Sequence, residues 1–449
     1  MLVRSFAFSF FIILIGCTPK LPFFNEPINQ AEINTDESMS LNEEKILEHQ
    51  NEGKESIDPR LKRISEAPSL LASYKKIKAA KKNISIVQSQ SEPNLSAISN
   101  IGPKLDNDEV ELDASGGVSL TQLINDGGAL NAMTEAAKLN VKVAKLDYIQ
   151  SVNAELMKVL RAEQTILNFY KIEKIYKEQL AVYNENLPLI KTAAKANIIS
   201  KTDILKLEQL KLKSEEAFLT SKTAADAANL LRRKYKLTIE NEFFEVDLEK
   251  WKSFESLSTE TIFFELELIE TQISILEKDI EAIDASYSPY VALAGTATAD
   301  IIDIDNSLGF LGLNITLPVK DGGKRNFQRQ EKTMQIEALR NQKEDLTLLQ
   351  KTAFESLKTF DVIYKMRSKL LIEQISNSKI IAEDLELKLR AGAASVIDLA
   401  TEKMNFYDLR SQKVALEYQL LIEIMNFHQA VGRQCDLTKL CDQIESLSN

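Results

Sequence analysis

The feature that most constrains the fold is a series of segments that occurs twice at a fixed spacing. Residues 117–128 read GVSLTQLINDGG and residues 312–323 read GLNITLPVKDGG, which places the two Asp-Gly-Gly signals 195 residues apart. Further along, residues 199–203 (ISKTD) and 394–398 (ASVID) keep the same 195-residue spacing. A helix keeps its pattern of apolar residues when it gains or loses a whole turn, so that pattern alone would not hold two pairs of segments at one spacing. The constant spacing therefore indicates an internal duplication.

Each copy predicts the same order of elements. A leading helix that ends near a proline (67–92 and 262–287) precedes two extended segments, a very long helix (about 129–190 and 324–390) and a return helix (about 200–235 and 395–431). Leucines at a seven-residue spacing in the first long helix are typical of a coiled-coil-like helix. At about 62 residues it would be about 90 Å long, far more than a globular domain buries. Pro188 lies inside this pattern, so we expect a kink or an early stop there.

The extended segments alternate between apolar and small or polar residues. In residues 310–317 the odd-numbered positions are apolar, and residues 291–299 alternate in a similar way. Such runs have the length of a transmembrane barrel strand, although a soluble half-buried hairpin shows the same local pattern. Four strands are too few to close a pore, and an open sheet edge cannot lie in lipid. Either the hairpins are soluble, or several chains pool their strands into one closed barrel. We expect the acidic cluster at 106–113 in the loop between the first two strands.

The N-terminus predicts export and lipidation. The apolar run Ser5–Ile15 is too short for a membrane-spanning helix, which needs roughly 20 residues, but it fits the apolar core of a secretory signal. It ends in Leu-Ile-Gly-Cys17, which resembles the lipobox of bacterial lipoproteins; an ordinary signal peptide that happens to carry a cysteine is the alternative. Thr18, rather than an aspartate, favours the outer membrane by resemblance to enterobacterial sorting rules. We therefore expect a signal peptide at 1–16 and a lipid anchor and tether at 17–66.

Composition argues against several classes of protein. The formal net charge of −11 disfavours a nucleic-acid partner, which needs a basic surface. With two histidines and three cysteines, little material exists for a metal site or a catalytic triad, so we expect neither a cofactor nor an enzyme. In an oxidising compartment Cys435 and Cys441 can form a disulfide, and two free thiols are the alternative.

The duplicated order resembles the TolC-like outer-membrane factors, the exit ducts of tripartite efflux pumps and type I secretion systems. The resemblance covers about residues 67–432, with one repeat at 67–261, a second at 262–432 and a C-terminal tail at 433–449. It implies a mainly α protein with a small β part. Three chains would form a helical barrel and share a 12-stranded transmembrane β-barrel. The implied partners are a periplasmic adaptor, an inner-membrane transporter and outer-membrane lipid, and the implied cargo is small molecules or proteins.

The break between long and return helix would form the periplasmic tip. Family members place Gly-x-x-Ser/Thr there, where adaptors dock. Gly392 and Ser395 fit this pattern in the second repeat, and Asn197 and Ser200 take these places in the first. Asparagine tolerates the left-handed backbone that such a turn needs. Plain helix capping accounts for the same residue types.

Two aspartates follow these turns. Asp398 matches a position where family members place an acidic residue that narrows the tunnel, and Asp203 is its counterpart in the first repeat. Three copies would form a ring of like charge that repels itself. The resemblance thus implies a periplasmic gate, while a cap of the return helix remains the simpler role. For the whole chain, a periplasmic coiled-coil scaffold or adhesin lipoprotein without a pore is the alternative function.

The lipobox gives the first testable prediction. Cys17 should be the first residue of the mature protein and should carry acyl chains. Intact mass spectrometry of the membrane fraction should find a chain that begins at Cys17 with the added mass of the lipid. Cleavage at any other position would contradict this assignment.

Overall fold

The computed structural model describes residues 57–449 except 107–108, 239–242, 245, 247–263 and 301–306. In chain order its elements are α2 (Pro59–Ser65), α3 (Pro68–Gln88), a 3-10 turn (Ser89–Ser91), β1 (Asn94–Asp106), β2 (Glu109–Asn125), α4 (Ala129–Lys195), α5 (Lys201–Lys234), α7 (Phe264–Ala285), β3 (Tyr290–Asp300), β4 (Ser307–Thr316), α8 (Lys324–Arg390), α9 (Val396–Ala430), a second 3-10 turn η3 (Gln434–Leu437) and α10 (Cys441–Leu447). The order helix, two strands, long helix, return helix therefore occurs twice along the described chain.

The two long helices have the same length. Both α4 and α8 contain 67 residues, which corresponds to about 100 Å. Each begins after a glycine with a left-handed backbone, Gly128 or Gly323. Helix α4 runs through Pro188 to Lys195, so the expected alternative of an early stop is wrong. A proline removes one backbone hydrogen bond, but Ile190, just beyond it, is buried in an apolar cluster that holds the last turns in place.

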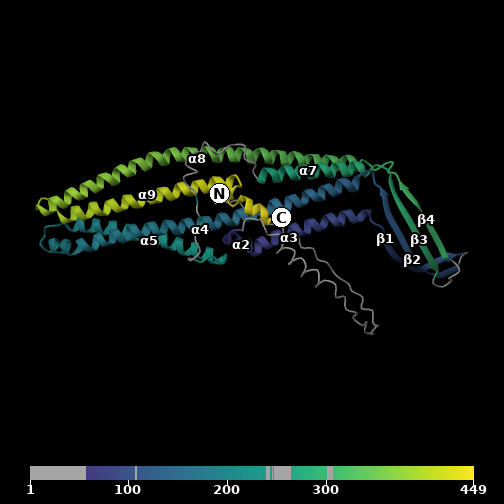
Figure 1. Cartoon of the computed structure of the whole chain (residues 1–449), viewed down its shortest axis with the longest axis horizontal. Helices are drawn as coiled ribbons and strands as arrows, with labels where there is room; N and C mark the ends of the chain where they lie inside the picture. Colours follow the sequence, from purple (N-terminus) through teal and green to yellow (C-terminus); the bar gives the residue numbers. More distant parts are fainter. Residues whose placement is uncertain (1–56, 107–108, 239–242, 245, 247–263, 301–306) are drawn as a thin grey trace, which may run out of the picture. The chain divides into compact units, whose positions relative to one another are not determined.

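Helix α4 is the centre of the helical packing. It lies against α3, α5, α7 and α9, while α8 lies against α7 and α9 (Figure 1). The leucine spacing in the sequence predicted its buried stripe, because Leu146 and Leu160 are both buried. Asn153 occupies the intervening position of that stripe and is also fully buried.

The core extends beyond the segment expected to fold. The predicted tether 17–66 includes α2, whose Leu61 and Ile64 are fully buried in the main apolar cluster. Asp58 caps α2 by accepting a hydrogen bond from the Arg60 backbone N–H at 2.7 Å. The predicted tail 433–449 also folds, and its Leu437 and Ile444 join the same cluster. Both ends of the described chain are therefore part of the folded core, because each carries apolar residues at helical spacing.

A buried ion pair ties α4 to α5. Arg232 Nε lies 3.2 Å from Glu163 Oε1, and both side chains are almost completely buried. The Phe244 backbone N–H donates to the other carboxylate oxygen of Glu163 at 2.8 Å. The Phe243 ring stacks on the Arg232 guanidinium at 4.4 Å. Burial raises the pKa of Glu163, whereas the Phe244 N–H and Arg232 act in the opposite direction.

The four strands form one antiparallel sheet in the order β1-β2-β3-β4. Strands β1 and β2 are longer than the sequence suggested, with 13 and 17 residues. Asp106 pairs with Glu109 and Lys104 with Glu111, so only residues 107–108 lie between the strands. The expectation that the acidic cluster forms the loop is wrong for Asp106, Glu109, Glu111 and Asp113, whose backbones pair within the strands, and Asp108 lies outside the described residues.

The buried pair gives a stability prediction. Arg232→Met should lower the free energy of unfolding by about 3–5 kcal/mol, because it leaves the Glu163 charge buried without its cation. Thermal unfolding of the detergent-purified protein, followed by circular dichroism, would measure the loss. Arg233→Met on the exposed side of the same turn is the matched control. An equal change in both variants would contradict a special role for the pair.

Candidate functional site

One face of the sheet is mainly apolar, with Ser99 and Gln122 as polar exceptions. In an antiparallel sheet, residues directly opposite each other project to the same side. Leu95 pairs with Leu120 across β1 and β2, and Leu293 pairs with Leu313 across β3 and β4. The register extends this face over all four strands, with the residues Leu95, Ala97, Ile101, Val118, Leu120, Val291, Leu293, Ala297, Leu311, Leu313 and Ile315. We call this set the apolar face.

Much of the apolar face is exposed in the single chain. Leu95, Leu311 and Ile315 have exposed fractions of 68%, 70% and 65%. A large contiguous apolar patch of this kind marks a surface that contacts a membrane or another protein. No helix in the described part of the chain has both the length and the apolar composition that a bilayer-spanning helix needs.

The opposite face of the sheet is mainly small and polar. Ser96 pairs with Ser119, which in turn pairs with Thr296. Thr121, Thr298 and Asn314 lie on the same side, and its larger apolar or aromatic residues include Ile98, Leu123, Tyr290 and Phe310. A sheet with one apolar and one polar face separates lipid or protein core on one side from water on the other.

Both edges of the sheet are open. Within the described chain, β1 pairs only with β2 and β4 pairs only with β3. Each edge therefore presents a row of backbone N–H and C=O groups without a strand partner. Unprotected edges of this length are templates for pairing with another strand.

The first tip turn joins α4 to α5. Asn197 has a left-handed backbone with φ 54°, as the sequence predicted for this turn. Ser200 caps α5 by accepting from the Asp203 backbone N–H at 3.1 Å, and its hydroxyl donates to the Asp203 carboxylate at 2.7 Å. Lys206 Nζ lies 3.6 Å from the same carboxylate. The Asp203 carboxylate is therefore held by the capping residue of its own helix and by Lys206.

The second tip turn joins α8 to α9 and differs from the first in the surroundings of its aspartate. Gly392 has φ 72°, and Ser395 caps α9 by accepting from the Ile397 backbone N–H at 3.2 Å. Asp398 lies in the first turn of α9 and is exposed. Within the described chain its carboxylate makes no hydrogen bond or ion pair. The two aspartates that the sequence made equivalent thus have different surroundings.

An apolar cluster packs the two tip turns together. It contains Tyr183, Ile190, Ile199, Leu207, Val396, Ile397, Ala400 and Met404. Lys213 and Asp408 form an ion pair at 3.1 Å between α5 and α9. The two tip turns, which contain Asn197, Ser200, Gly392 and Ser395, therefore pack together within a single chain. Sequence spacing alone did not establish this contact.

Sequence reasoning missed apolar stripes on the outer surfaces of the helices. On α5, Leu205, Leu212 and Leu219 are exposed at a seven-residue spacing. On α8, the exposed residues Ile363, Met366, Leu370, Ile380 and Leu387 follow one another at steps of 3, 4, 10 and 7 residues, and the polar residues Glu373, Asn377 and Asp384 fill the remaining positions of this heptad pattern. Both spacings are the coiled-coil signature. The signal is visible in the sequence, but only the structure shows that these faces have no partner helix in the described chain.

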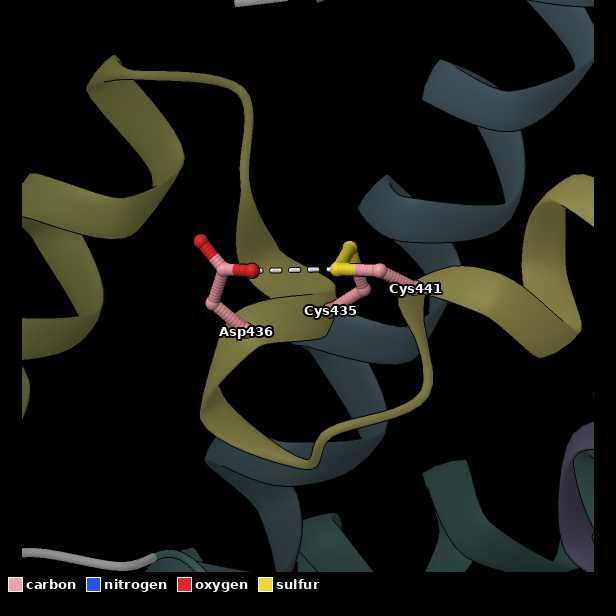
Figure 2. Close-up of side chains that lie close together, drawn as sticks. All are labelled: Cys435, Asp436 and Cys441. Atoms are coloured by element: carbon pink, nitrogen blue, oxygen red, sulfur yellow. Dashed lines mark hydrogen bonds between the residues drawn. A yellow bond between two sulfur atoms is a disulfide. The ribbon is translucent and has the colours of Figure 1, made fainter. Parts of the chain in front are cut away.

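Cys435 and Cys441 are joined by a disulfide, with their Cα atoms 4.9 Å apart. Figure 2 shows the bond between η3 and the start of α10, with Asp436 Oδ1 at 3.1 Å from Cys441 Sγ. The three side chains lie close enough to suggest a cation site. Bonded sulfurs carry no thiolate, however, and the thiolate is the form of cysteine that binds metal ions. Cys17, the predicted lipidation site, lies outside the described residues.

Comparison with solved structures identifies the architecture. The chain aligns with the outer membrane protein VceC of Vibrio cholerae at a TM-score of 0.67 and 12% identity, over 83% of this chain and 95% of that one. For the CmeC outer membrane channel of Campylobacter jejuni the TM-score is 0.66 at 13% identity, over 94% and 98% of the two chains. The chain has the fold of the TolC-like outer-membrane factors.

The same fold is shared with the open state of the MtrE outer membrane channel of Neisseria gonorrhoeae, at a TM-score of 0.63 and 15% identity, over 84% and 89% of the two chains. No protein-family model and no curated protein matches the sequence itself. The TolC-like fold is thus recognised through backbone geometry at identities where sequence comparison finds nothing.

Proposed function

We propose that the chain is the outer-membrane exit duct of a tripartite efflux pump or a type I secretion system. The observation that carries this proposal is the two-faced sheet with two open edges. Its apolar face suits lipid, and its small polar face suits a water-filled lumen. Backbone groups at an edge must be hydrogen-bonded inside a bilayer, so the sheet must be closed by other chains.

Closure follows from the strand order. If β1 of one chain pairs with β4 of the next, no edge remains, and three chains supply a 12-stranded barrel. The helices support a ring of the same symmetry. The exposed stripe on α5 and the exposed stripe on α8 have matching coiled-coil spacing, and packing one against the other between neighbouring chains would cover both. The repeated order of elements then gives each chain two similar portions of the wall, as expected of an internal duplication.

The helical tip is proposed as the periplasmic end of the duct. Asn197, Ser200, Gly392 and Ser395 would form the surface on which a periplasmic adaptor docks, and the adaptor would connect the duct to an inner-membrane transporter. Lipidation at Cys17 would add an anchor in the outer membrane. The cargo would be small molecules or proteins, and no catalytic step is proposed for the chain.

The gate assignment is proposed for Asp398 rather than equally for both aspartates. Three exposed Asp398 carboxylates around a common axis would repel one another, because nothing within the described chain compensates them. Asp203, by contrast, is held by Ser200 and Lys206. The charge that biases the tip toward opening therefore comes mainly from the second repeat.

The oligomeric state tests the duct directly. The detergent-purified protein should be a trimer in light scattering coupled to size exclusion, because the four strands of one chain cannot close a barrel. A stable monomer would refute the duct.

Membrane extraction separates the duct from a lipid-tethered scaffold without a pore. Cys17→Ala should still require detergent for release if the sheet lies in the bilayer. Release by salt or carbonate would instead favour the scaffold, with its apolar face covered by protein.

The gate can be tested in a planar bilayer. Asp398→Ala should lower cation preference and change single-channel conductance while leaving the trimer intact. Ser395→Ala, which removes the cap of the same helix without removing a charge, is the matched control, since losing a cap should cost about 0.5–2 kcal/mol of stability without altering selectivity. Unchanged selectivity in Asp398→Ala together with a lower melting temperature would leave Asp398 only the role of stabilising the N-terminal turn of α9 by its charge.

A further inference from the structure

The two junctions between strand and long helix differ in charge. In the first, Asn125 and Ala129 flank Asp126-Gly-Gly; in the second, Lys320 and Lys324 occupy the corresponding places around Asp321-Gly-Gly. The next residue is Leu130 in the first junction and Arg325 in the second. The duplicated order therefore carries a basic cluster in one copy only.

Part of this cluster is occupied by internal contacts. Asp321 accepts hydrogen bonds from the Tyr287 hydroxyl at 2.6 Å and from the backbone N–H groups of Gly323 and Arg325 at 2.9 and 2.8 Å. These bonds lower the pKa of Asp321 to about 2, the Tyr287 bond contributing most. Asp284 lies between two arginines, with Arg325 Nη2 at 3.0 Å and Arg329 Nε at 3.5 Å. Asp321 thus covers the first N–H groups of α8, and an anion could not bind there.

Lys320 and Lys324, unlike Arg325 and Arg329, take no part in these internal contacts. Lys320 and Lys324 are exposed, and within the described chain neither ammonium group has an acidic partner. The junction carries four cationic side chains (Lys320, Lys324, Arg325 and Arg329) and the two carboxylates of Asp321 and Asp284. The surface therefore keeps an excess of positive charge, which the two lysines present to solvent.

The lysines lie where the apolar face ends. The odd-numbered apolar positions of β4 continue past the strand through Leu317 to Val319, which is 91% exposed. Lys320 follows at once, and Phe327 on the first turn of α8 is 66% exposed. Cations directly beyond an apolar band, with an exposed aromatic ring beside them, are the arrangement by which proteins meet the headgroup layer of a membrane.

We propose that Lys320 and Lys324 bind the phosphate of an anionic phospholipid headgroup in the leaflet that faces the helices. The inference rests on the proposed duct, since it requires the sheet to lie in a bilayer. Lysine binds phosphate as a point charge, and anionic lipid attracts exposed basic groups near the surface of the membrane. One such site per chain would fix the depth of the barrel at its helical end, on the second junction only.

Native mass spectrometry of the trimer tests the site. Detergent-purified protein is titrated with phosphatidylglycerol or with phosphatidylcholine, and the retained lipids are counted. The intact protein should prefer phosphatidylglycerol. The double variant Lys320→Asn/Lys324→Ala introduces the residues found at the corresponding positions of the first junction. It should bind phosphatidylglycerol roughly tenfold more weakly while remaining a trimer.

The controls keep the outcome specific. Lys191→Asn/Lys201→Ala removes two exposed lysines near the tip and should retain phosphatidylglycerol as the intact protein does. Should the double variant fail to assemble, the single variants Lys320→Gln and Lys324→Gln should each show part of the loss. Unchanged retention in these variants, or full displacement of the lipid by millimolar inorganic phosphate, would overturn the site. A monomeric intact protein would refute the duct itself, whereas a trimer indifferent to lipid charge would refute only the lysine site.

Discussion

The backbone of an antiparallel sheet demands partners along both of its edges, and the rest of this molecule can be understood from that demand. The four strands satisfy one another but leave β1 and β4 open. Exposed strands on either side of an apolar face would aggregate if left in water. In the proposed duct the same groups pair between chains, so the feature that makes a single chain incomplete is the one that specifies assembly.

Some of the helices, like the sheet, have surfaces that a single chain leaves without a partner. Helix α4 is surrounded by four other helices, and its buried stripe contains both leucines and the polar Asn153. Helices α5 and α8 instead keep apolar residues on their outer faces, where no helix in the described chain covers them. Interior packing therefore completes the core of one chain, and the outer stripes remain for contacts with neighbouring chains.

The chain has two junctions between strand and long helix and two tip turns of similar sequence, and the differences between them suggest a division of roles. At the tip, Asp203 is engaged by Ser200 while Asp398 is free of partners within the described chain. At the sheet, Asn125 and Ala129 correspond to Lys320 and Lys324. In both places the second copy carries the unsatisfied charge. We therefore assign the proposed gate and the proposed lipid contact to the second copy, because the first copy has a paired aspartate at the tip and neutral residues at the junction.

The sequence by itself determined the features that depend on local periodicity. Leucine spacing and the Asp-Gly-Gly signals predicted where α4 and α8 begin, and Asn197 and Gly392 predicted the tip turns, because helix continuation and left-handed backbone are decided within a few residues. Tertiary structure decided what depends on distant partners. The apolar face exists only because the register sets Leu95 opposite Leu120 and Leu293 opposite Leu313. Leu61 joins the core, and Glu163 finds Arg232, through contacts between segments far apart in the chain. The burial of a stripe such as Leu205, Leu212 and Leu219 likewise depends on which helices surround it. The residue pattern along one helix does not specify which helices these are.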